Sequence, residues 1–65
     1  MARINGEEVN EAVGKSISAY LTEAGYDSRR VAVERNGEIV PKANYEQVII
    51  SEADTIEVVS FVGGG

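Results

Sequence analysis

Apolar and polar residues alternate in short runs along this chain, and one stretch has the spacing of a helix. Within residues 16–24, apolar side chains recur every three or four positions, which places them on one face of a helix. They are Ile17, Tyr20, Leu21 and Ala24. Ser16 comes just before the face as a candidate N-cap, and Gly25 comes just after it as a candidate C-cap residue. The pattern predicts a single main helix over residues 16–24.

The other apolar runs are short and rich in β-branched residues, as strands are. They cover residues 2–4, 8–10, 31–34, 38–40 and 55–62, with a further candidate at 48–50. Asn5-Gly6 and Asn36-Gly37 each separate two of these runs, and Asn-Gly is a strong hairpin signal because both residues tolerate positive φ. Pro41 ends one strand because it lacks an N–H. Residues 42–46 are expected to form a turn or a short 3₁₀ helix.

The resulting order is β-β-α-β-β-(β)-β. A single amphipathic helix buries its apolar face against one side of a sheet. We therefore predict an α+β fold of the ubiquitin-like β-grasp type, with a mixed sheet of four to five strands packed on one main helix. The first and last strands should be adjacent and parallel. With 65 residues in all, we expect one domain over residues 1–62 and a flexible glycine tail at 63–65.

The last predicted strand has two different faces. Ile56 and Val58 share one face, and Val59 and Phe61 share the other. If Ile56 and Val58 face the helix, Val59 and Phe61 form an apolar pair on the open face of the sheet, which is a candidate protein-binding surface. The alternative is that Phe61 folds back over the edge of the sheet.

The three glycines at the end, Gly63, Gly64 and Gly65, cannot help a sheet, because glycine loses the most entropy on ordering. Their use is geometric: a chain without Cβ atoms can thread a narrow channel and present a bare carboxylate, and three residues reach about 10 Å. A frayed terminus or a cloning scar is the alternative. Ordering each tail residue costs about 1–2 kcal/mol, so docking affinity must come from the folded surface. We assign that role to Val59, Phe61 and Val62 with acidic neighbours.

Composition excludes several kinds of site. The chain has no Cys and no His, which removes disulfides, thiol nucleophiles and imidazole bases. The carboxylates are scattered and no metal site is predicted. The serines have no histidine to activate them, so no catalytic residue of its own is expected. No apolar run is long enough to span a bilayer and no signal sequence is visible, so we expect a cytoplasmic protein without membrane contact.

The charge balance also bears on partners. Six basic residues against eleven acidic ones give a net charge of −5, the wrong balance for binding nucleic acid. Acidity instead suits a partner with a basic docking surface. Simple solubility is the alternative explanation.

Residues 31–34, 36–41 and 56–65 read VAVE, NGEIVP and IEVVSFVGGG. Together they resemble the ThiS family of sulfur carriers in thiamine biosynthesis, and the similarity covers essentially the whole chain. The resemblance implies that Gly65 is the reactive residue. A ThiF-type enzyme would use ATP to adenylate its carboxylate, and a cysteine desulfurase or another donor would supply sulfur to form a thiocarboxylate. The thiazole synthase ThiG would accept that sulfur. The carrier itself would bind no cofactor.

Other functions stay open at this stage. A related carrier could serve molybdopterin synthesis or tRNA thiolation, and a ubiquitin-like modifier could use the same activated glycine to form isopeptide bonds. A binding module with an inert end is a further alternative. An enzyme with its own active site fits least, for want of Cys, His and a cleft.

Overall fold

The computed structural model describes residues 1–61 and contains a five-stranded sheet in the order β2-β1-β5-β3-β4. The strands are β1 (Arg3–Ile4), β2 (Glu7–Glu8), β3 (Val31–Arg35), β4 (Glu38–Val40) and β5 (Thr55–Ser60). β1 and β5 run parallel, whereas the other neighbouring strands are antiparallel, so the sheet is mixed. The predicted adjacency of the first and last strands is confirmed, and β5 lies at the centre of the sheet.

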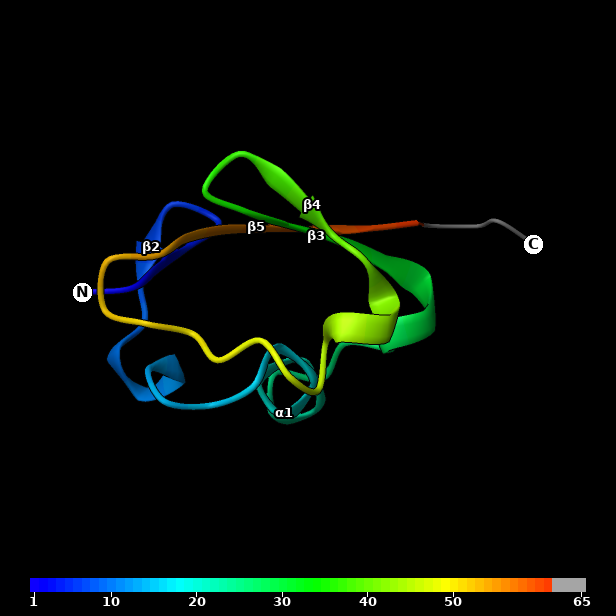
Figure 1. Cartoon of the computed structure of the whole chain (residues 1–65), viewed down its shortest axis with the longest axis horizontal. Helices are drawn as coiled ribbons and strands as arrows, with labels where there is room; N and C mark the ends of the chain where they lie inside the picture. Colours follow the sequence, from blue (N-terminus) through cyan, green and yellow to red (C-terminus); the bar gives the residue numbers. More distant parts are fainter. Residues whose placement is uncertain (62–65) are drawn as a thin grey trace.

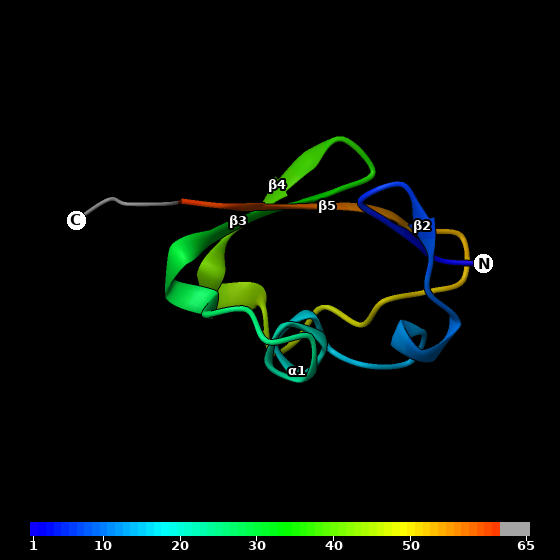
Figure 2. The ribbon, with the colours of Figure 1, turned by 180° about the vertical axis from the view of Figure 1, so that it is seen from behind.

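The main helix, α1 (Ile17–Glu23), and the longer connecting segments lie on one side of this sheet (Figures 1 and 2). Three short 3₁₀ helices belong to those segments: η1 (Asn10–Ala12), η2 (Ser28–Arg30) and η3 (Lys42–Asn44). β5 runs from the N-terminal end of the molecule toward the opposite end. This one-sided arrangement agrees with the predicted β-grasp fold and leaves a second sheet face for other contacts.

Local signals at both ends of α1 explain its bounds. The Ser16 hydroxyl accepts a hydrogen bond from the Ala19 amide at 3.0 Å, which satisfies one of the unpaired N–H groups of the first turn. At the other end Gly25 has φ +88°. The Tyr26 amide donates to the Leu21 carbonyl at 2.9 Å, which closes a Schellman motif. The predicted helix is confirmed, one residue shorter at each end.

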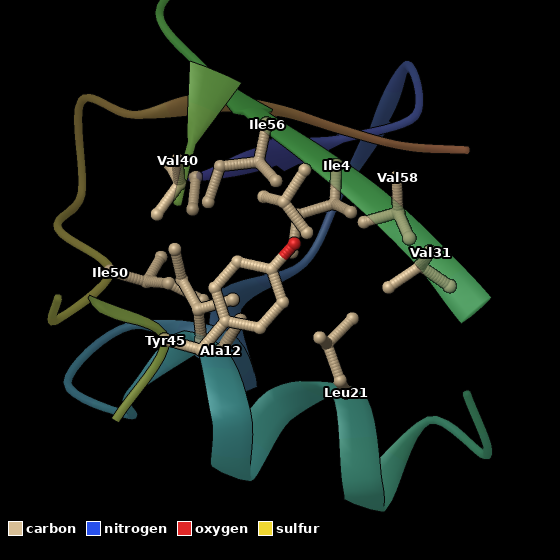
Figure 3. Close-up of a cluster of buried hydrophobic side chains, with 12 residues drawn as sticks. Ile4, Ala12, Leu21, Val31, Val40, Tyr45, Ile50, Ile56 and Val58 are labelled. Atoms are coloured by element: carbon tan, nitrogen blue, oxygen red, sulfur yellow. The ribbon is translucent and has the colours of Figure 1, made fainter. Parts of the chain in front are cut away.

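The core lies between α1 and the inner face of the sheet. Ile17 and Leu21 of the helix pack there, and Tyr45 extends its ring toward the sheet (Figure 3). Ile56 and Val58 of β5 face this core, with 1% and 8% of their surfaces exposed. The predicted inner face of the last strand is therefore confirmed. Of the predicted helix face, Ala24 is exposed because it lies just past the end of the helix.

Several strands differ from their predicted bounds, and β1 and β3 differ by only one residue. The return strand expected at 8–10 is only Glu7–Glu8, because the chain turns into η1 to bury Ala12. Residues 48–50 form no strand of the sheet: the Ile50 amide donates to the Lys15 carbonyl, and only an isolated bridge joins Ile49 to Ser16. β5 ends at Ser60, earlier than the predicted 62. A 3₁₀ helix is present within the predicted segment 42–46.

Candidate functional site

β5 carries the candidate site, and both Asn-Gly turns bond to it. Asn5 accepts the Val58 amide on its side-chain oxygen at 2.8 Å and donates its own amide to the Ile56 carbonyl at 2.9 Å. Asn36 accepts the Thr55 amide in the same way at 2.9 Å. Both asparagines have positive φ, which asparagine tolerates better than most residues. The turns that set the hairpins therefore also hold the strand that leads to Phe61.

Asp54 fixes the start of β5. Its buried carboxylate accepts hydrogen bonds from the Arg35 guanidinium at 2.9 Å, the Asn36 side chain at 3.0 Å and the Ser51 amide at 2.9 Å. Burial acts to raise the pKa of Asp54, but these donors outweigh it and lower the pKa to about 2. Asp54 is thus a charged anchor that joins the β3–β4 hairpin to the last strand.

Val59 and Phe61 lie on the outer side of the sheet, as predicted, with 55% and 57% of their surfaces exposed. The alternative in which Phe61 folds back over the sheet edge would bury its ring, and the exposure argues against it. Val59 stands opposite Ala32 of β3, and Ile39 of β4 is 64% exposed on the same face. We call these four residues the outer apolar patch. Ile39 was missed, although its alternation with the buried Val40 could have revealed it.

Two glutamates adjoin the outer apolar patch. Glu34 of β3 and Glu57 of β5 are directly opposite each other, and Ile39 continues the same row on β4. Within residues 1–61 neither carboxylate forms an ion pair. Like charges directly opposite each other on neighbouring strands are destabilising. A surface that places two carboxylates beside exposed apolar side chains suits a partner with basic residues around an apolar centre.

The remaining site predictions fall on Val62, Gly63, Gly64 and Gly65, which lie outside the described residues. Their roles, and the division into a domain at 1–62 and a tail at 63–65, stay predictions. Among residues 1–61, no cluster of His, Cys, Asp or Glu could hold a metal ion. No helix in that same stretch has the length and apolar character needed to cross a membrane.

Known proteins with similar sequences identify the family of this chain. A model of the ThiS family matches residues 1–65. This chain belongs to the ThiS family. The family predicted from the sequence is therefore confirmed. The sulfur carrier protein ThiS of Bacillus subtilis is 38% identical over 66 residues that cover all of both chains.

A solved structure and a longer protein are also similar to this ThiS-family chain. The crystal structure of the thiamine biosynthesis protein ThiS from Geobacter metallireducens has a TM-score of 0.77 at 25% identity and covers 98% of this chain and 97% of that one. It confirms the predicted ubiquitin-like β-grasp fold. A thiazole synthase from Paramagnetospirillum magneticum is 55% identical over 62 residues, which are 95% of this ThiS chain. The chain spans only 19% of the length of that thiazole synthase.

Proposed function

We propose that this ThiS-family chain carries sulfur on the carboxyl carbon of Gly65 for the formation of the thiamine thiazole. The observation that carries the proposal is the match to the sulfur carrier of Bacillus subtilis over the full length of both chains. The structure contributes a rigid support for the reactive end: β5 is paired on both sides and points its apolar outer residues to solvent. Gly65 must bear a free carboxylate, which an intact mass of the purified protein would establish.

The chemistry proceeds in three steps: adenylation of the carboxylate, transfer of the donor sulfur and reductive release of the donor. A ThiF-type enzyme transfers AMP from ATP to the Gly65 carboxylate and releases pyrophosphate, because a carboxylate is a poor electrophile until it is adenylated. The terminal sulfur of a cysteine-desulfurase persulfide, or of another donor, then attacks the acyl carbon and AMP leaves. Reductive cleavage of the new S–S bond by a thiol leaves the thiocarboxylate. The chain is thus a protein co-substrate of these enzymes. We place it in the cytoplasm, where the ATP for adenylation is available.

The acceptor of the sulfur is a thiazole synthase of the ThiG type. The match inside the Paramagnetospirillum thiazole synthase supports this pairing, because there a segment related to this chain is part of the synthase polypeptide. The outer apolar patch with Glu34 and Glu57 supplies the docking surface for these partners, together with Val62. Gly63 and Gly64 form the segment that enters the partner's channel.

The direct test is the mass of the protein after reaction. Incubation with the cognate ThiF-type enzyme, ATP, a persulfide donor and a thiol should raise the intact mass by about 16 Da, since one oxygen is replaced by sulfur. Fragmentation should place the increase on Gly65. A reaction without ATP is the control and should leave the mass unchanged. A competent enzyme that leaves the mass unchanged with ATP would overturn the proposal.

A second prediction concerns the role of Glu34 and Glu57 in docking. Glu57→Gln should stabilise the fold by a few tenths of a kcal/mol (~0.3) at low salt, because it relieves the repulsion with Glu34. The same change should weaken binding to the activating enzyme and flatten the salt dependence of that binding. Urea unfolding and titration calorimetry measure the two effects. Glu46→Gln, which removes an exposed charge outside the sheet, should change neither. Unaltered binding by Glu57→Gln would remove the pair from the docking surface.

A further inference from the structure

Lys42 makes an unusual set of contacts for a lysine on the surface. Its Nζ donates to the backbone carbonyls of Ser28 and Arg29 at 3.1 Å each and of Val31 at 3.0 Å. A lysine ammonium has three N–H donors, so all three are used. These acceptors belong to the segment 28–31 around the end of η2. Within that segment, only the Arg30 carbonyl does not bind Lys42. Lys42 therefore fixes the backbone that joins η2 to β3.

The Arg30 carbonyl, between those acceptors, binds the last strand instead. It accepts a hydrogen bond from the Phe61 amide at 2.8 Å. This bond lies past the last paired residues of β5, where Ser60 stands opposite Val31. Figures 1 and 2 show the segments around residues 28–31 and 42 at the same end of the molecule as the end of β5. The backbone held by Lys42 is thus the backbone that holds Phe61.

We propose that Lys42 is a positioning residue, which fixes the direction in which the chain leaves the domain toward Gly65 through the Arg30–Phe61 hydrogen bond. This inference rests on the proposed sulfur-carrier function. An acyl transfer depends steeply on how the reacting carbon is placed, and a displacement of about 1 Å can change a rate about 100-fold. A fixed backbone at Phe61 defines the point and the direction from which the chain continues into the activating enzyme.

The chemistry of lysine suits this role. The three N–H groups of a lysine ammonium point outward from one nitrogen, so this single group can donate to three carbonyls that surround it. A cation is also favourable at the C-terminal end of a helical turn, where carbonyls are left unpaired. The nearby arginines do not compete for these acceptors, because the side chains of Arg29 and Arg30 both pair with Asp27. Lys42 is thus the cation that holds this part of the backbone.

The test compares Lys42→Met with Lys15→Met. Methionine keeps most of the apolar stem of lysine and removes the donors, and both variants lose one positive charge. Lys15 is a matched control, because it forms an ion pair with Glu23 away from this segment. Should Lys42→Met fail to fold, Lys42→Gln, which retains one short amide donor group, is measured in the same way. The readouts are amide hydrogen exchange and the kinetics of adenylation by a ThiF-type enzyme.

We expect Lys42→Met to speed exchange of the Phe61 amide by about tenfold relative to the Asn5 amide, which bonds the far end of β5 and corrects for global stability. In the same variant kcat should fall by about threefold or more, and KM for the carrier should change less than kcat, because Val59 and Ile39 of the outer apolar patch stay exposed for docking. Lys15→Met should change neither quantity.

The outcomes separate this inference from the proposed function. If the wild-type protein accepts neither AMP nor sulfur, the proposed sulfur-carrier function is wrong, and the inference about Lys42 is wrong with it. Active wild-type protein with an unchanged kcat in Lys42→Met would overturn the inference alone, whatever the exchange of Phe61 does. A fall in kcat without faster exchange at Phe61 would also overturn it, because the effect would not pass through that hydrogen bond.

Discussion

Deletion of Gly64 and Gly65 should abolish sulfur uptake while the fold is retained. Two residues span about 7 Å, so the new terminal carboxylate would stop short of the site where adenylation takes place. Since about 1 Å of misplacement can cost about 100-fold in rate, we expect activity below detection. The buried core of the described residues is made of residues numbered from 2 to 58, and the deletion removes none of them.

Thermal unfolding should give the truncated protein a wild-type melting temperature. The truncated protein should also inhibit activation of the full-length carrier competitively, with an inhibition constant near the KM of the carrier, because docking belongs to the folded surface. A truncated protein that unfolds would show that the glycines are structural. One that folds but does not compete would move the docking energy from the outer apolar patch to the tail.

The sequence predicted the parts of the fold that local rules determine. The helix spacing of Ile17 and Leu21, the Ser16 cap and the two Asn-Gly turns each act within a few residues, and all are present in the structure. Errors arose where distant contacts override local preference. The 48–50 run has strand-like residues, but its backbone bonds to the segment before α1, so its β-branched character was no guide.

The candidate site was predictable to the extent that it follows strand parity. The alternation in β5 correctly placed Val59 and Phe61 outward once Ile56 and Val58 were assigned to the core. The facing pair Glu34–Glu57 depends on the register between two strands that are more than 20 residues apart in the chain, and composition carries no record of register. Lys42 was equally hidden, because its acceptors are backbone carbonyls, which have no sequence signature.

Asp54→Asn should destabilise the fold at neutral pH by about 2 kcal/mol, the free energy that corresponds to lowering the pKa from 3.8 to about 2. One carboxylate oxygen accepts from both Arg35 and Ser51, and the other accepts from Asn36. Asparagine has only one oxygen, so at least one of these donors would face an NH₂ group and lose its partner.

The pH dependence of this loss has a definite sign. Because the pKa of Asp54 is lower in the folded state than in the unfolded state, its contribution is present above about pH 4 and is lost as the pH falls through 2. The gap in unfolding free energy between wild type and Asp54→Asn, measured with urea from pH 7 to pH 2, should therefore narrow on acidification. Glu52→Gln, an exposed charge in the same turn, should show almost no gap at any pH. A gap for Asp54→Asn that stays constant to pH 2 would mean that the Asp54 charge does not anchor the start of β5.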